Sequence, residues 1–409
     1  MRVSTVRMEA MRGTTAGDGA GLRVAMVHYW LLNYGGGERV LSALLDLFPQ
    51  ADVFVLLANE RTIARFAQHS VITSFLQRLP GSCRYHHHLL PLCPFALEQF
   101  DLRGYDLVVS SESGPAKGVL TSTNTLHINY CHSPMRYIWD LHHDYTNGKD
   151  FNSLTRLIFG AVAHYMRMWD LASASRVDSF VANSKNVADR IRKHYRRDAT
   201  VIYPPVDVMS GYVTEHTGAY YLTVGRLVDY KRADLAVEVC TRLGRPLHVV
   251  GEGPQYKRLR AVAGPTVEFL GELNDAELRD QYARCRALVF AGEEDFGMVP
   301  VEAQSFGRPV IAYGRGGALE TIVGFYPGEM VLREMHTGVF FHEQTVESLE
   351  EAILAFEAVE GKFSSAVIRA NAGRFDATHF KNAMAQFVTD RLEEFRRASN
   401  RANFKSVSV

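Results

Sequence analysis

Residues 23–48 read RVAMVHYWLLNYGGGERVLSALLDLF, and this stretch decides the fold class. VAMVHYW is an apolar run of strand length, NYGGGE is a glycine-rich turn, and RVLSALLDLF places its apolar residues at helical spacing. A buried strand that passes through a glycine loop into an amphipathic helix is the opening unit of an α/β domain. The sequence therefore predicts that such a domain begins near Arg23.

The alternation of short apolar runs with helical segments continues well beyond this unit. Runs rich in Val, Ile and Phe, which are typical of buried parallel strands, occupy residues 51–58, 105–111, 125–131 and 179–184. A second set occupies residues 220–226, 246–253, 267–273, 287–292 and 309–314. We therefore expect an α/β chain with two Rossmann-like, doubly wound parallel-sheet domains that face each other across a cleft.

The boundary between the two sets lies at VIYPPVD, residues 201–207, where two prolines favour an extended hinge. We predict a first domain over residues 23–205, which binds the acceptor, and a second domain over residues 218–375, which binds the donor. Residues 376–409 are predicted to form a helical tail that packs on what precedes it. Residues 1–22 have no apolar segment of the kind found in secretory signals, and we expect a flexible leader.

Composition and charge exclude several classes of protein. The 409 residues include 45 Lys or Arg and 45 Asp or Glu, so the formal net charge is zero. This balance argues against a nucleic-acid-binding protein, which needs a basic excess to neutralise phosphates. The five cysteines lack C-x-x-C spacing, which indicates reduced thiols rather than a zinc site or a disulfide framework. No apolar run approaches the roughly 20 residues of a membrane span.

The most informative motif is EDFGMVPVE, which follows a predicted strand and enters a helix. Glu294 is expected in the loop at the carboxyl end of the strand, and Glu302 a couple of turns into the helix. Both carboxylates can then face one bound molecule. Backbone N–H groups at the start of the helix are expected to point into the same site, and they belong to Phe296, Gly297 and Met298.

These residues and the motifs around them resemble the retaining glycosyltransferases of family 4, which have the GT-B fold. The matching motifs are GGG at 35–37, ANS at 182–184, YPPVD at 203–207, VGR at 224–226 with Lys231, VVGEGP at 249–254, FLG at 269–271 and GRPVIAYGRGGALE at 307–320. Each motif is weak alone, but their order and spacing cover most of the chain and are highly specific.

The resemblance implies that a nucleotide-diphosphate sugar is the donor. In the family, cations matching Arg226 and Lys231 grip the diphosphate, whose negative charge grows as the sugar departs. Backbone N–H groups of the glycine loop, here Gly36 and Gly37, assist them. The alternative is that both cations are ordinary surface residues.

The two carboxylates of the motif receive separate roles from the resemblance. Glu302 would accept hydrogen bonds from the ribose hydroxyls, and Glu294 would hold the hydroxyls of the donor sugar and oppose positive charge at the anomeric carbon. The alternative for Glu294 is simple stabilisation of the helix dipole. Leu273 lies in the segment where relatives place the base, and Asp275 could accept from guanine, although Asn274 or Asp275 is equally a conventional helix N-cap.

Two residues after the strand at 125–131 complete the predicted site. His132 matches the histidine that the family places beside the donor sugar, and its alternative is a structural histidine. Arg136 is a candidate for contact with acceptor phosphates. The sequence contains no D-x-D motif, so we expect no metal ion and no other cofactor. Consecutive histidines at 86–88 and 142–143 rarely direct side chains to one point.

Longer matches, in CHSPMRYIWDL and GEEDFGMVPVEAQ, are similar to bacterial GDP-mannose-dependent mannosyltransferases of exopolysaccharide or O-antigen assembly. The acceptor there is a polyprenyl-diphosphate-linked glycan, so we expect a cytoplasmic enzyme with peripheral contact at the inner membrane. Residues 78–95 and 157–169 combine cations with apolar or aromatic side chains, as interfacial segments do. Burial in the first domain is the alternative for both, and it explains residues 157–169 equally well.

Competing functions remain at this point. A front-face displacement by a metal-independent retaining enzyme needs no side-chain nucleophile, whereas a covalent route would use a carboxylate. A UDP-sugar-dependent transferase and a non-catalytic partner subunit that binds nucleotide sugars are the alternatives in function. A dehydrogenase is disfavoured, because neither the GGG loop nor GEGP forms G-x-G-x-x-G.

Overall fold

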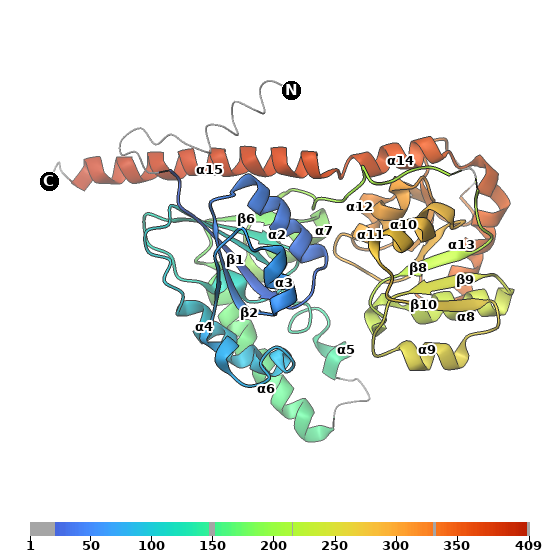
Figure 1. Ribbon diagram of the computed structural model, residues 1–409, viewed down its shortest axis with the longest axis horizontal. Helices are drawn as coiled ribbons and strands as arrows, with labels where there is room; N and C mark the ends of the chain where they lie inside the picture. Colours follow the sequence, from blue (N-terminus) through green and yellow to red (C-terminus); the bar gives the residue numbers. More distant parts are fainter. Residues whose placement is uncertain (1–20, 147–151, 215, 330–332, 407–409) are drawn as a thin grey trace. The chain divides into compact units, whose positions relative to one another are not determined.

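The chain folds into two compact units, shown in the computed structural model in Figure 1. The first unit comprises the chain up to Pro204 together with the segment from Phe380, and the second runs from Pro205 to His379. The structure describes residues 21–146, 152–214, 216–329 and 333–406. The predicted leader lies outside these ranges, apart from its last two residues.

The first unit contains a seven-stranded parallel sheet in the order β3-β2-β1-β4-β5-β6-β7. Its strands are β1 Val24–Leu31, β2 Asp52–Ala58, β3 Val71–Thr73, β4 Leu107–Glu112, β5 Leu126–Cys131, β6 Ser179–Ala182 and β7 Ala199–Val201. The strand order reverses at β1, where Val27 lies opposite Phe54 of β2 and Ser110 of β4. Open α/β sheets bind ligands beyond the carboxyl ends of the strands at such a reversal.

Helices cover both faces of this sheet. They are α2 Gly36–Leu47, α3 Glu60–Arg65, α4 Cys93–Glu98, α5 His142–Thr146, α6 Ser153–Ala174 and α7 Lys185–Tyr195, with short 3-10 turns η1 Phe75–Arg78, η2 His86–Leu92 and η3 Ala116–Gly118. Leu41 and Leu44 of α2 pack with Met26 on one face, and Ala96 of α4 packs with Val27 on the other. Alternate residues of β1 are therefore buried on opposite faces, which explains its continuous apolar sequence.

The second unit repeats this architecture with the order β10-β9-β8-β11-β12-β14-β13, again parallel throughout. Its strands are β8 Tyr221–Val224, β9 Leu247–Val250, β10 Val267–Gly271, β11 Leu288–Phe290, β12 Val310–Tyr313, β13 Gly324–Phe325 and β14 Gly338–Phe341. The order reverses between β8 and β11, where Leu222 lies opposite Leu288. The two doubly wound parallel sheets confirm the predicted fold class.

The helices of the second unit are α8 Ala233–Leu243, α9 Tyr256–Val262, α10 Asp275–Arg284, α11 Met298–Ser305, α12 Ala318–Thr321, α13 Val346–Val359 and α14 Ser365–Gly373, with 3-10 turns η4 Asp229–Lys231 and η5 Glu360–Lys362. Asn274 caps α10, since its side chain accepts hydrogen bonds from the backbone of Ala276 and Glu277, each at 3.0 Å. The N-cap alternative therefore describes Asn274, and Asp275 is the exposed first residue of the helix.

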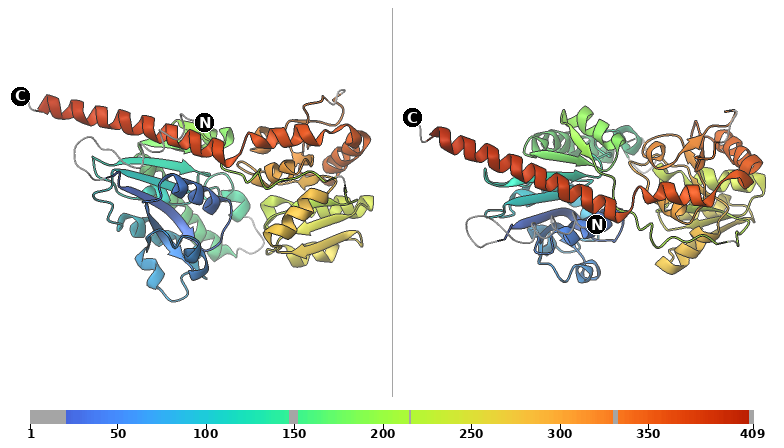
Figure 2. Two further views of the ribbon diagram at one scale, coloured as in Figure 1. Left: turned by 45° about the horizontal axis from the view of Figure 1, so that its top comes forward. Right: turned by 90° about the horizontal axis from the view of Figure 1, so that it is seen from above.

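Helix α15, Ala377–Ser406, is the long red helix in Figure 2. Its apolar residues Phe380, Met384, Val388 and Leu392 recur every four positions and join the core of the first unit. Lys381 also pairs with Asp46 of α2 at 2.7 Å. The tail is helical and packs on the preceding chain, and its apolar stripe returns to the first sheet rather than to the second unit.

Candidate active site

The predicted donor residues of the second unit gather at the reversal of its sheet. Arg226 follows β8, and Glu294 lies in the loop between β11 and α11. Lys231 ends the short turn η4 and reaches back to the same place, where its Nζ lies 2.9 Å from Oε1 of Glu294. Residues far apart in sequence therefore meet at the carboxyl edge of the sheet, as the topology requires.

The Lys231–Glu294 pair stays accessible to a ligand. The side chains of Lys231 and Glu294 are 23% and 20% exposed. Burial by itself would lower the pKa of Lys231, but the negative charges of Glu294 and, more weakly, Glu302 outweigh it and raise that pKa. Lys231 is therefore a firmly protonated cation that is paired with Glu294 and also feels the charge of Glu302.

Glycines allow the backbone to close around this pair. Gly225 has φ +144°, and a Cβ there would lie 3.2 Å from Nζ of Lys231. A Cβ on Gly251 would lie 2.2 Å from the carbonyl oxygen of Gly225, closer than real Cβ atoms come. The VGR and VVGEGP motifs are thus required by close approach of β8 and β9 at the site.

Glu302 lies in α11, about one turn from its start, and it has a fixed hydrogen-bond partner. The hydroxyl of Tyr282 in α10 donates to its Oε2 at 2.8 Å. Gly297, with φ +85°, occupies the N-cap of α11, so the helix begins at Met298. The Glu294 loop is held from the other side, since the N–H of Gly317 donates to its carbonyl oxygen at 2.8 Å.

Little free space remains within this cluster. The cavity lined by Gly225, Arg226, Lys231, Phe290 and Glu294 measures about 10 Å³, which is room for roughly one water molecule. Arg226 itself is exposed.

The predicted residues of the first unit also come together at the reversal of their own sheet. His132 directly follows β5, and its Nε2 lies 3.0 Å from Oγ of Ser111 at the end of β4. A Cβ on Gly37, in the first turn of α2, would lie 3.8 Å from the same Nε2 and 3.1 Å from the Tyr29 hydroxyl. The glycine loop and His132 are therefore neighbours, with Gly36 at the first position of α2.

Burial sets the charge of this second cluster. Burial, together with repulsion from His28, lowers the pKa of His132 from 6.5 to about 3. Burial would raise the pKa of Glu38, but His28 and the N–H of Gly35, which donates to Oε2 at 2.8 Å, hold it below its ordinary value. At neutral pH His132 is uncharged and Glu38 is anionic.

Sequence reasoning missed His28, Glu38 and Ser111. His28 is fully buried, and its Nε2 lies 3.7 Å from Oε1 of Glu38. The signal that could have found Ser111 is its place near the carboxyl end of β4, whereas His28 lies opposite Ser111 in the middle of β1. The side chain of Glu38 turns back onto the start of its own helix, which the motif GGGER alone does not reveal.

Two further predicted residues have described interactions with other groups. Arg136 is half-buried and helps to lower the pKa of Asp140, after the larger effect of the hydrogen bond from His194. Leu273 is half-buried and packs against the core that contains Leu222. No observation assigns a ligand to either residue, so both remain predictions.

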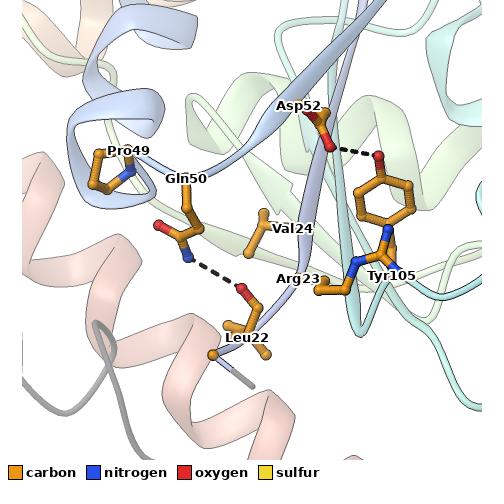
Figure 3. Close-up of a pocket in the computed structure, with 8 residues that line it drawn as sticks. Leu22, Arg23, Val24, Pro49, Gln50, Asp52 and Tyr105 are labelled. Carbon is orange, nitrogen blue, oxygen red and sulfur yellow. Dashed lines mark hydrogen bonds between the residues drawn. The ribbon is translucent and has the colours of Figure 1, made fainter. Parts of the chain in front are cut away.

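The described residues offer no metal site, and a second cavity lies away from these clusters. Within the described ranges, no group of three or more His, Cys, Asp or Glu side chains is arranged to hold a metal ion. A cavity of about 740 Å³ lies at the opposite, amino edge of the first sheet, between Arg23, Gln50, Asp52 and Tyr105 (Figure 3). There the Tyr105 hydroxyl donates to Asp52 at 2.6 Å. None of the predicted site residues lines it.

Protein-family models match both units. Residues 34–209 match the family described as Glycosyltransferase Family 4, and residues 211–374 match Glycosyl transferases group 1. The solved structure of Alr3699/HepE from Anabaena in complex with UDP-glucose is similar with a TM-score of 0.64 and 17% identity, over 90% of this chain and 99% of that one.

Curated relatives are similar over shorter stretches. The D-inositol 3-phosphate glycosyltransferase of Geodermatophilus obscurus is 29% identical over 262 residues, which cover 56% of each chain. The GDP-mannose-dependent alpha-mannosyltransferase of Corynebacterium glutamicum is 35% identical over 100 residues, 24% of each chain. The chain spans about half the length of the first two curated relatives that it matches.

Proposed function

Because this chain carries the Glycosyltransferase Family 4 and Glycosyl transferases group 1 domains of GT-B glycosyltransferases, we propose that it is a retaining glycosyltransferase with a nucleotide-diphosphate sugar as donor. The observation that carries the proposal is the accessible cluster of Arg226, Lys231, Glu294 and Glu302 at the reversal of the second sheet. It combines cations for a diphosphate with carboxylates for hydroxyl groups, which is the set that such a donor needs.

In the proposed reaction, the bond between the sugar and the diphosphate breaks, and negative charge grows on the departing phosphate oxygen. Arg226 and Lys231 stabilise that charge, and the N–H groups of Gly36, Gly37 and the start of α11 add neutral donors. Lys231 suits this role because its raised pKa keeps it protonated. Glu294 holds the donor sugar and Glu302 the ribose.

The proton of the acceptor hydroxyl requires a base, and His132 is a poor one. With a pKa of about 3, its imidazole binds protons too weakly to take one near neutral pH. We assign His132 a hydrogen-bonding role beside the donor sugar, while the departing phosphate oxygen accepts the acceptor's proton. This front-face displacement gives retention without a covalent intermediate and without a metal ion.

Mannose from GDP-mannose is the donor we favour, with a polyprenyl-diphosphate-linked glycan of exopolysaccharide or O-antigen synthesis as acceptor. Support for the donor is the 35% identity to the mannosyltransferase of C. glutamicum over 100 residues. Arg136 is the proposed contact for acceptor phosphates, and Leu273 lies near the base. A lipid-linked acceptor implies peripheral contact with the cytoplasmic face of the inner membrane.

The test is donor hydrolysis and transfer across GDP-mannose, UDP-glucose, UDP-galactose, UDP-N-acetylglucosamine and ADP-glucose, with and without EDTA. We expect turnover of GDP-mannose in EDTA, loss of roughly 100-fold or more in Glu294→Gln, and retention of activity in Glu238→Gln. Glu238 is an exposed residue of α8 and serves as the control. NMR of the product checks the anomeric configuration.

Other outcomes separate the parts of the proposal. Selective turnover of a uridine donor would keep the enzyme class and reject mannose. Dependence on a divalent cation would reject metal independence, and an inverted product would reject retention. Nucleotide binding without turnover of any donor would favour a non-catalytic partner subunit.

A further inference from the structure

Helix α6 of the first unit turns an apolar side to solvent. Its buried side consists of Ala163, Met166, Asp170, Ser173 and Ala174. The opposite side carries six large apolar residues, between 41% and 71% exposed, which we call the outer face of α6: Leu154, Leu157, Ile158, Tyr165, Met168 and Leu171. The spacing of these residues places them along one stripe of the helix.

This arrangement reverses the usual pattern of a surface helix, whose outward side is polar. Single exposed apolar residues are ordinary, but a continuous stripe of them marks a surface that another body covers. From the sequence alone, burial in the first domain and contact with a membrane surface explain residues 157–169 equally well. The exposure of Leu157 and Met168, at 71% and 56%, decides against burial of this stripe within the described chain.

A neighbouring segment extends the apolar surface. Leu90 of η2 packs against Ala163 and Met166 of α6, and Trp169 Nε1 donates to Glu98 of α4 at 3.3 Å. The helices α4 and α6 accordingly lie near each other in Figure 1. The segment formed by η2 and α4, with the turn before it, exposes its own large residues Tyr85, Leu92 and Phe95.

Most of the charged residues in and around these two segments are basic. The chain as a whole has equal numbers of acidic and basic residues, yet residues 71–97 and 152–169 contain no Asp or Glu. The basic residues of the two segments are Arg78, Arg84, Arg156 and Arg167, together with His86, His87, His88 and His164. Arg78, Arg84 and Arg156 are exposed. The exposed charged residues within 71–97 and 152–169 are therefore all basic, and Glu98, which follows at the end of α4, is half-buried and paired with Arg176 at 3.1 Å.

We propose that the outer face of α6 lies in the interfacial layer of an anionic lipid bilayer, with the arginines of both segments at the headgroups. A second copy of the same surface would present the same basic and apolar side chains and so offer the arginines no acidic partner. Anionic headgroups neutralise them instead. In the described part of the chain, no helix is long and apolar enough to cross a membrane, which fits α6 lying in the plane of the surface.

The inference deepens the proposed function, since it assigns the surface through which a lipid-linked acceptor is reached. It is tested without substrates, so its failure is distinguishable from failure of the glycosyltransferase proposal. The full chain is sedimented with vesicles of phosphatidylglycerol and phosphatidylethanolamine, and separately with phosphatidylcholine vesicles. We expect binding to the anionic vesicles that weakens as salt is added.

Matched variants identify the surface. Leu157→Ser with Ile158→Ser should weaken binding to anionic vesicles by roughly tenfold or more, because two exposed apolar side chains no longer enter the bilayer. Arg84→Gln and Arg156→Gln should each weaken it by about fivefold. The control is Leu354→Ser in α13 of the second unit, a leucine that is also exposed, at 45%, and it should bind like the wild type.

Two results would overturn the proposal. One is binding to anionic vesicles that is equal in the wild type and in the Leu157→Ser, Ile158→Ser variant. The other is a stable dimer in analytical ultracentrifugation that this variant converts to monomer, which would assign the outer face to a second copy. The circular dichroism spectrum and the midpoint of urea unfolding should stay unchanged in every variant, which checks that each one is folded.

Discussion

Each unit contains a lysine paired with carboxylates, and the two clusters differ in their surroundings rather than in their chemistry. Lys117 of the first unit is fully buried with Asp170 and Glu112, whose side chains are at most 1% exposed. Lys231 and Glu294 of the second unit are about a fifth exposed, at 23% and 20%. A buried charge serves the fold, whereas an accessible one can exchange its partner for a ligand.

The buried cluster is fully bonded. Trp139 Nε1 and the Tyr195 hydroxyl each donate to Oδ2 of Asp170 at 2.8 Å, while Lys117 pairs with Oδ1. Burial raises the pKa of Glu112 to about 7. Through Glu112 the cluster also supports the candidate site, because the N–H of His132 donates to the Glu112 carbonyl oxygen at 2.7 Å.

Removing the buried lysine should give the largest effect. Lys117→Met leaves Asp170 as an unpaired buried charge, and we expect the free energy of unfolding to fall by about 3–5 kcal/mol. All three tryptophans, Trp30, Trp139 and Trp169, lie in the first unit, so fluorescence during urea unfolding reports on that unit. Lys231→Met is the control, and its unfolding is also followed by circular dichroism, which also reports on the second unit. An equal loss of unfolding free energy in both variants would show that burial does not distinguish the two lysines.

Removing a charge from the accessible cluster of the second unit should affect catalysis and not stability. Arg226→Gln should lower kcat/KM for the sugar donor by about 100- to 1000-fold, since one preorganised cation of the leaving diphosphate is lost, and it should leave unfolding nearly unchanged. The control is Arg258→Gln, because the side chain of Arg258 in α9 is 71% exposed. Equal activity of the Arg226 variant and the wild type would remove Arg226 from the donor site.

The two units should also respond differently to acid. Burial lowers the pKa of His127 in β5 from 6.5 to about 4. The unfolded chain then binds a proton that the folded chain refuses, so stability is complete above pH 6.5 and is lost as pH falls towards 4. This histidine contributes about 3 kcal/mol to that loss.

The measurement is urea unfolding, followed by tryptophan fluorescence at several pH values, in the wild type and in His127→Gln. Between pH 7 and pH 4 the wild type should lose about 3 kcal/mol more of its free energy of unfolding than the variant does. A constant difference would show that His127 does not titrate as its burial implies.

The smallest effect concerns the orientation of Glu302. Tyr282→Phe removes the hydroxyl that donates to Glu302, which should cost about 1 kcal/mol of donor binding. We expect KM for the donor to rise roughly fivefold with kcat nearly unchanged, as measured in steady-state kinetics. A fall in kcat at constant KM would instead connect Tyr282 to the chemical step.

Much of the fold could be predicted from the sequence because buried parallel strands leave continuous apolar runs. All ten of the short apolar runs correspond to strands, with boundaries that differ by a few residues. The strands β3, β7 and β13 are only two or three residues long and leave too little pattern to detect. β14 was missed although GVFF is a fully buried run, since it follows the last motif that the resemblance used.

The residues of the candidate site also fall into those that the sequence predicts and those that only the fold reveals. Arg226, Lys231, Glu294 and Glu302 belong to local motifs whose spacing is visible in one dimension. The buried group around Lys117 depends on residues 53 positions apart, and His28 is one histidine within a strand. Only the fold shows that these side chains are neighbours, and only burial separates the structural lysine from the proposed functional one.

The central claim is that Lys231, and not Lys117, holds the diphosphate of a sugar nucleotide. Calorimetric titration of GDP and UDP into the wild type and Lys231→Met tests it most directly. We predict that the variant binds its preferred nucleotide about 10- to 100-fold more weakly, because a hydrogen bond between charged groups contributes about 1.5–3 kcal/mol. Equal affinity in the wild type and the variant would contradict the account.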